Sequence, residues 1–145
     1  MITDDSRRPT SVKVYSAKAN EDALDGYRLG WATGDTDIII GVVTDTFNFT
    51  WVPDNDVVSK TRFPSFFNDF KANAEADGRA KYFMKFDNII HRQVRDAIGD
   101  DDVDISDQIG DILYEAADWI VDGFDRGSYF NAAKDGKVIW DMATT

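Results

Sequence analysis

Carboxylates are the residues of this sequence best able to do chemistry, since the chain has 24 Asp, three Glu, one His and no Cys. Without Cys there is no disulfide, no thiolate nucleophile and no thiolate zinc site. The single histidine, His91, lacks a second His with which to bind a metal, and we interpret it as a structural or surface residue. With no catalytic motif, no cofactor fingerprint and no metal site, the sequence predicts a protein that is not an enzyme and needs no cofactor.

Two patterns that suggest a ligand site have simpler explanations. Asp100, Asp102 and Asp104, with Asp111 in twelfth position, imitate the ligand order of a calcium loop, but Ile105 occupies the position that needs Gly. Gly30 and Gly34 fall in a predicted hairpin rather than before a helix, which argues against a phosphate loop. Paired carboxylates carry little information when Asp is so abundant, so a metal-dependent hydrolase is only the third alternative.

The most distinctive stretch is acidic: residues 100–125 contain ten acidic residues and no Lys or Arg, within a chain of net charge −11. Read as a helix from about Ser106 to Phe124, its carboxylates recur every three or four residues and lie within roughly 80° of one another. The opposite side is apolar. These spacings predict an amphipathic helix with one continuous acidic face. With the acids that lead into it, the face consists of Asp100, Asp101, Asp102, Asp104, Asp107, Asp111, Glu115, Asp118 and Asp122.

An acidic face of this kind has two interpretations. It can be a solvated surface that keeps the protein soluble. It can also imitate a nucleic-acid backbone, with one carboxylate per ~5 Å against one phosphate per ~3.4 Å of a DNA strand. We adopt the second as the hypothesis: a small acidic DNA mimic, of the phage anti-restriction or anti-CRISPR type, that inhibits a basic nucleic-acid-binding partner. The alternative is a non-enzymatic virion, tail or adaptor protein that self-associates.

The elements expected around this helix define an α+β fold. After a disordered lead over residues 1–10, we expect a single domain over residues 11–145. It begins with an antiparallel β-meander of about four strands, followed by three amphipathic helices and a C-terminal β-hairpin. The expected strands are residues 11–15, 27–32, 37–43 and 46–52; the expected helices begin near residues 64, 80 and 106; and the hairpin joins residues 128–133 to 137–142 through Asp135-Gly136.

Two surfaces complete the expectations about partners. The second predicted helix carries a basic stripe that could meet the acidic face of another copy, which suggests a homodimer; the stripe consists of Lys81, Lys85, Arg92 and Arg95. The aromatic strand Phe47, Phe49, Trp51 could stack on bases, but the acidic balance argues against direct nucleic-acid binding. No apolar run is long enough to span a membrane and no signal peptide is evident, so we expect a cytoplasmic protein without membrane contact.

Overall fold

A computed structural model describes residues 9–76, 81–94 and 112–145. In chain order its elements are α1 (Pro9–Thr33), α2 (Thr36–Ile40), β1 (Val43–Trp51), the 3-10 turn η2 (Val52–Asp54), β2 (Asp56–Ser59), α3 (Phe63–Glu75), β3 (Met84–Val94), β4 (Ile112–Val121), β5 (Asp125–Lys134) and β6 (Lys137–Thr144).

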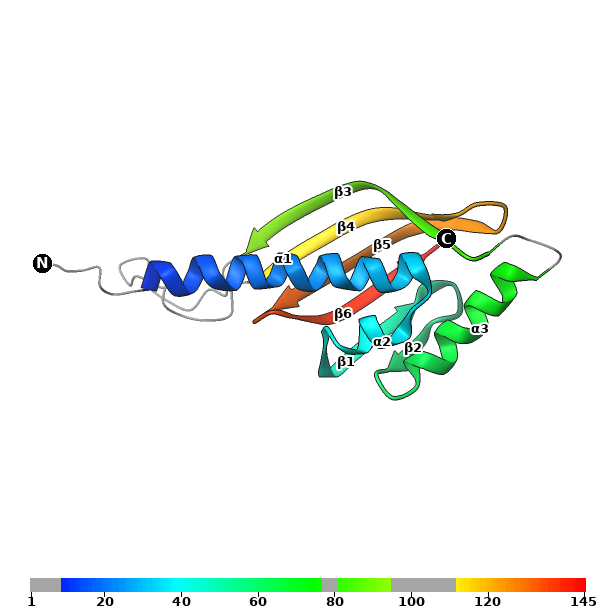
Figure 1. The fold of residues 1–145 in the computed structure, drawn as a ribbon, viewed down its shortest axis with the longest axis horizontal. Coiled ribbons are helices and arrows are strands. Elements are labelled where there is room, and N and C mark those ends of the chain that lie inside the picture. The colour runs from blue at the N-terminus through cyan, green and yellow to red at the C-terminus, as the bar shows by residue number, and fades with distance from the viewer. Residues whose placement is uncertain (1–8, 77–80, 95–111) are drawn as a thin grey trace, which may run out of the picture.

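The six strands form one sheet in the order β2-β1-β6-β5-β4-β3. All neighbours pair antiparallel except β1 and β6, which run parallel and so join the first strand of the chain to the last. The long helix α1 lies across the sheet against β3 to β6, and α3 lies beside β1 and β2 (Figure 1). A curved sheet with helices over one face therefore encloses the core.

The positions of the core residues follow two different spacings of buried side chains, one along a helix and one along a strand. Along α1 the buried residues Leu24, Tyr27 and Trp31 recur every three or four positions, so they share one helix face. Along β4 every second residue is buried, and alternation of this kind directs one set of side chains to the helices and the other set away from them. The space between α1, α3 and the sheet is filled mainly by aromatic rings.

No helix of the described residues covers the opposite face of the sheet. Ile90, Ala116, Phe130 and Met142 pair across four neighbouring strands and so form one row on that face. Three of them remain well exposed, Ile90 at 66%, Phe130 at 40% and Met142 at 42%. The bare face of the sheet is therefore apolar along its middle row.

The predicted fold class, a β-meander packed against three helices with a C-terminal hairpin, is wrong. The expected strands at residues 11–15 and 27–32 belong to α1. In the second of these, alternation of Tyr27, Leu29 and Trp31 suggested a strand, but Leu29 is 53% exposed while the other two are buried. The helical period decides the structure there because it alone buries both large rings on one face.

The expected strand at residues 37–43 is also wrong. Its β-branched Ile run favours a strand, yet residues Thr36–Ile40 form α2. The Asp35 side chain caps this helix by accepting a hydrogen bond from the Asp37 amide at 3.0 Å, and Ile39 is buried against α1. A local cap and a tertiary contact together outweigh propensity.

Two of the three expected helices are strands. The helix expected from about residue 80 contains β3, and the acidic helix contains β4. The strands β3 and β4 pair with each other, and β4 also pairs with β5. Other local signals match the structure: an aromatic strand at β1, a helix that begins beside Pro64, and a tight turn at Asp135-Gly136 that joins β5 to β6. That turn, however, lies inside the large sheet rather than in a separate hairpin.

Candidate functional site

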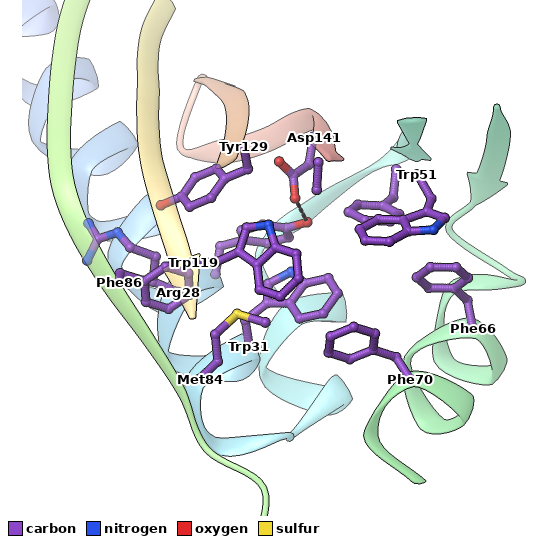
Figure 2. Close-up of a pocket in the computed structure, with 13 residues that line it drawn as sticks. Arg28, Trp31, Trp51, Phe66, Phe70, Met84, Phe86, Trp119, Tyr129 and Asp141 are labelled. Carbon is purple, nitrogen blue, oxygen red and sulfur yellow. Dashed lines mark hydrogen bonds between the residues drawn. The ribbon is translucent and has the colours of Figure 1, made fainter. Parts of the chain in front are cut away.

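A pocket lies in the core between the helices and the concave side of the sheet (Figure 2). Helices α1 and α3 and five of the six strands contribute to its wall. Its lining is almost entirely aromatic and apolar, with one carboxylate, and consists of Tyr27, Arg28, Trp31, Phe49, Trp51, Phe66, Phe70, Met84, Phe86, Trp119, Tyr129, Asp141 and Ala143. A concave apolar site with few polar groups is the usual form of a small-molecule site.

The pocket is a narrow slot between rings. It contains about 420 Å³ of space outside the protein atoms, with its opening to solvent included, but the centres of water molecules fit into only about 30 Å³ of it. Trp51, Phe66 and Phe70 are only partly buried and contribute one side of the wall. That space holds no more than a few water molecules, so an organic ligand enters only if such partly buried rings move.

Asp141 is the carboxylate in this pocket. It lies on β6 and is 3% exposed. Burial raises its pKa from 3.8 to about 7; the nearby Glu115 charge adds to this, while the Tyr27 hydroxyl and the Met142 amide act in the opposite direction. Its Oδ1 atom has no well-formed hydrogen bond to any described residue. Asp141 can therefore exchange a proton near neutral pH through a free oxygen.

Tyr27 holds the other oxygen of Asp141. Its hydroxyl donates to Oδ2 at 2.6 Å, the bond drawn as a dashed line in Figure 2. Burial and the Asp141 charge raise the pKa of Tyr27 well above its ordinary value, so the phenol remains protonated and continues to donate. Because α1 carries Tyr27 and β6 carries Asp141, the packing of the long helix on the sheet fixes this pair.

Asp141 is one end of a row of three buried polar residues. Cross-strand register places Glu115 of β4 opposite Asn131 of β5, and Asn131 opposite Asp141 of β6. All three are buried, in a core that is otherwise almost wholly apolar. Neither side-chain polar atom of Asn131 has a hydrogen-bond partner among the described residues. Such groups are rare in proteins and indicate a place where water or a ligand completes the structure.

Glu115, at the other end of the row, is held by a cluster of donors. Arg28 Nε lies 3.0 Å from its Oε2, His91 Nε2 lies 2.7 Å from its Oε1, and the Tyr129 hydroxyl donates to it. Although burial works against the charged form, the Glu115 hydrogen bond and charge raise the pKa of Arg28. Glu115 is thus a paired structural anion, whereas Asp141 has no cationic partner among the described residues.

Only three residues of the predicted acidic face, Glu115, Asp118 and Asp122, belong to the described part of the chain, and these three do not share one face. Asp100, Asp101, Asp102, Asp104, Asp107 and Asp111 lie outside the described residues. Of the others, Glu115 and Asp118 lie on β4 an odd number of residues apart, so they point to opposite faces of the sheet. Glu115 is 1% exposed and Asp122 forms an ion pair with Lys85 at 2.6 Å. The described part of the predicted surface is therefore divided.

Asp118 belongs to a polar groove on the outer side of the sheet. It accepts hydrogen bonds from Asn88 and Ser128, both at 2.8 Å, and the Asn88 bond is the larger cause that lowers its pKa. The helix that was expected to carry the basic stripe does not form, because β3 is a strand. Lys85 and Arg92 nevertheless lie opposite Ile120 and Tyr114 of β4 and so point to the same, outer side of the sheet. Of the stripe, Arg95 is outside the described residues.

Sequence reasoning did not identify the pocket, although it considered Phe49 and Trp51 of the pocket wall as residues that could stack on bases. Asp141 carried a usable signal, as it is a lone acid within the apolar run Val-Ile-Trp-Asp-Met. Its partner Tyr27 did not, because the segment around it was interpreted as a strand. His91 was assigned a structural role, and it does contact a buried carboxylate.

Two kinds of feature are absent from the described ranges. No group of three or more His, Cys, Asp or Glu lies close enough together there to hold a metal ion. None of the helices described is long and apolar enough to cross a membrane.

The fold resembles several solved structures at low sequence identity. A ketosteroid isomerase-like protein from Erwinia carotovora atroseptica matches at TM-score 0.54 and 11% identity over 88% of this chain and 93% of that one. A candidate polyketide cyclase from Xanthomonas campestris matches at 0.53 and 10% identity, over 88% and 90% of the two chains. An NTF2-like protein from Cytophaga hutchinsonii matches at 0.50 and 14% identity, over 86% and 93%. No family model and no curated protein matches the sequence.

These findings overturn the functional hypothesis drawn from the sequence. The acidic helix on which the DNA-mimic inhibitor depended contains a sheet strand, and the phage anti-restriction and anti-CRISPR classes lose their support with it. The non-enzymatic assembly protein and the prediction that the chain is not an enzyme are contradicted as well, because the fold is shared with proteins named ketosteroid isomerase-like and candidate polyketide cyclase. What these likenesses show is the fold: this chain has an NTF2-like α+β architecture with a pocket in its core.

Proposed function

We propose that the protein is an enzyme that moves a proton on a small, flat, largely apolar carbonyl compound, with Asp141 as the proton acceptor and donor. The observation that carries this proposal is a buried carboxylate with one free oxygen in an aromatic pocket. A pKa of about 7 suits an acid–base group that works near neutral pH.

The chemistry needs only residues of the pocket. Ionised Asp141 takes a proton from the carbon next to the carbonyl, the electrons of that C–H bond enter the carbon–carbon bond, and the carbonyl oxygen becomes an enolate. Return of the proton to the same carbon, or to a conjugated one, regenerates the carboxylate. The apolar wall excludes water, which strengthens electrostatic interactions inside the pocket. The printed names of two structural neighbours, ketosteroid isomerase-like and polyketide cyclase, both refer to keto compounds and fit this class.

Hydrogen exchange in D₂O tests the proposal without knowledge of the natural substrate. The probe is 2-tetralone, a flat bicyclic ketone, and the readout is loss of its C1 proton signal by NMR. We expect the wild type to accelerate the exchange and Asp141→Asn to reduce the enzymatic rate by at least about 100-fold. The rate should rise with pH and level off above about 7, as Asp141 ionises.

Asp54→Asn is the matched control. Asp54 is an exposed residue of η2 outside the pocket, so this variant should exchange the ketone at the wild-type rate. Exchange by the wild type at the rate of buffer alone, or equal rates for wild type and Asp141→Asn, would contradict the proposal.

The cytoplasmic location expected from the sequence remains a prediction, which cell fractionation with immunodetection tests.

A further inference from the structure

The pocket contains a second polar atom without a partner, the indole Nε1 of Trp31. This nitrogen is buried and has no well-formed hydrogen bond to any described residue. An indole N–H is a donor only, and a buried Trp normally finds an acceptor. The pocket wall thus contains an N–H donor from α1 and the Oδ1 atom of Asp141 from β6, neither of which has a well-formed hydrogen bond to a described residue.

Packing fixes the Trp31 ring in place. It stacks on Phe67 with ring centroids 4.3 Å apart and meets Phe49, Phe63 and Phe70 at 5.6 to 5.9 Å. The Tyr82 hydroxyl donates to the Trp31 backbone carbonyl at 2.7 Å, which anchors this turn of α1. A donor held so firmly loses little freedom when it binds a ligand atom.

The indole also faces the correct part of the pocket. Trp31 lies one helical turn after Tyr27, and both line the pocket. Burial and the Asp141 charge dominate the raised pKa of Tyr27, but the Trp31 side chain acts to lower it, as an N–H directed toward the phenol oxygen does. Asp141 holds the same hydroxyl from its other side at 2.6 Å. Figure 2 shows Trp31 and Asp141 among the residues that line the pocket.

We propose that the Trp31 indole N–H is the donor that binds the ligand's carbonyl oxygen and thereby selects flat ketones over hydrocarbons of the same shape. This deepens the proposed function, on which it rests, by naming the residue that recognises the substrate class. The same N–H stabilises the oxygen as it gains negative charge.

A matched pair of ligands isolates this hydrogen bond. 2-Tetralone and tetralin share a bicyclic frame and differ in the carbonyl, and NMR titration measures the affinity of each. We expect the wild type to bind the ketone about tenfold more tightly, the effect of one good hydrogen bond. Trp31→Phe keeps an aromatic ring but removes the N–H, so the preference should fall to near one while tetralin affinity changes little.

Trp51→Phe is the control, because it removes another indole from the pocket wall. It should weaken both ligands alike and keep the preference for the ketone. A preference that survives in Trp31→Phe would overturn the inference, and so would a wild type that binds neither ligand. Since this readout is binding alone, loss of the preference in Trp31→Phe with no proton exchange by the wild type would leave the inference standing and reject the proposed function. Normal proton exchange by the wild type, together with an unchanged ketone preference in Trp31→Phe, would support the proposed function and reject the inference.

Discussion

At the scale of single residues, Asp141 links stability to pH in an unusual direction. Its pKa is about 7 in the fold against 3.8 ordinarily, so between these values the native state holds a proton that the unfolded chain has lost. Stability contributed by this proton is therefore lost as the pH rises through that window. One pKa unit corresponds to about 1.4 kcal/mol, which makes the whole effect on the order of 4 kcal/mol.

Comparison of the wild type with Asp141→Asn measures the contribution of the Asp141 proton to stability, since the other carboxylates are the same in both proteins. Between pH 5 and 8, the free energy of unfolding of the variant should rise relative to wild type by roughly 3 kcal/mol and then stay constant. Urea unfolding at a series of pH values gives the difference. A difference independent of pH would mean that Asp141 is already ionised at pH 5 in the folded protein.

Single residues also show where sequence reasoning stops. A lone acid in the apolar β6 segment could be recognised, but its position opposite Tyr27 depends on how α1 crosses the sheet, which no local spacing contains. Glu115 was misjudged for a related reason. As a charged residue it is expected at the surface, and only Arg28, His91 and Tyr129, distant in sequence, make its burial possible.

At the scale of elements, short-range signals were informative and long-range ones decided the fold. The turn at Asp135-Gly136 and the alternation of β1 are local, and both could be predicted. The segment around β4 has apolar residues at both helical and strand periods. Pairing with β3 on one side and β5 on the other selects the strand, and pairing partners are not visible from one segment.

Near the start of β5, residue 127 is a position where only glycine fits. A Cβ added at Gly127 would lie 1.8 Å from the Thr144 carbonyl oxygen of β6, the same oxygen that accepts the Trp119 indole hydrogen bond at 3.1 Å. Gly127→Ala must therefore displace the end of β6 and the pocket wall at Trp119. We expect a loss of at least about 2 kcal/mol in the free energy of unfolding by urea.

Gly41 provides the matched control for this change. Its φ of −70° suits any residue, and an added Cβ would find its nearest neighbour at 3.4 Å. Gly41→Ala should therefore leave stability unchanged or raise it by up to about 1 kcal/mol. Equal effects of the two substitutions would show that the contact at Gly127 relaxes without loss of stability, and that the paired ends of β5 and β6 can move apart.

At the scale of the whole molecule, the bare face of the sheet offers a surface for the homodimer expected from the sequence. That expectation, still a prediction, rested on acidic and basic stripes that two helices would carry, and those helices contain strands. The row through Ile90 and Phe130 replaces them, and Tyr114 and Trp140 beside the row are in ring contact with Phe130. Exposed apolar patches of this kind mark interaction sites.

Charges around the row favour a second copy as the occupant. Arg92 pairs with Tyr114 on one side of the row and Asp118 lies on the other side, two positions beyond Ala116 along β4. A two-fold axis through the row therefore brings Arg92 of one copy toward Asp118 of the other, as a self-complementary interface requires. Because apolar contact supplies most of the affinity, such a dimer should persist at high salt, whereas pairing of charged stripes would not.

Sedimentation equilibrium of Ile90→Lys tests this surface. The substitution buries a charge at the centre of the row, and we expect the dissociation constant to rise at least about tenfold. It also lowers the net negative charge of the chain, so weaker association cannot be attributed to added repulsion between copies. Leu29→Lys makes the same charge change at another exposed apolar residue, on α1, and should dimerise as the wild type does. A monomeric wild type would contradict the predicted dimer. Equal weakening of dimerisation by both substitutions would show that the dimer does not form through this face.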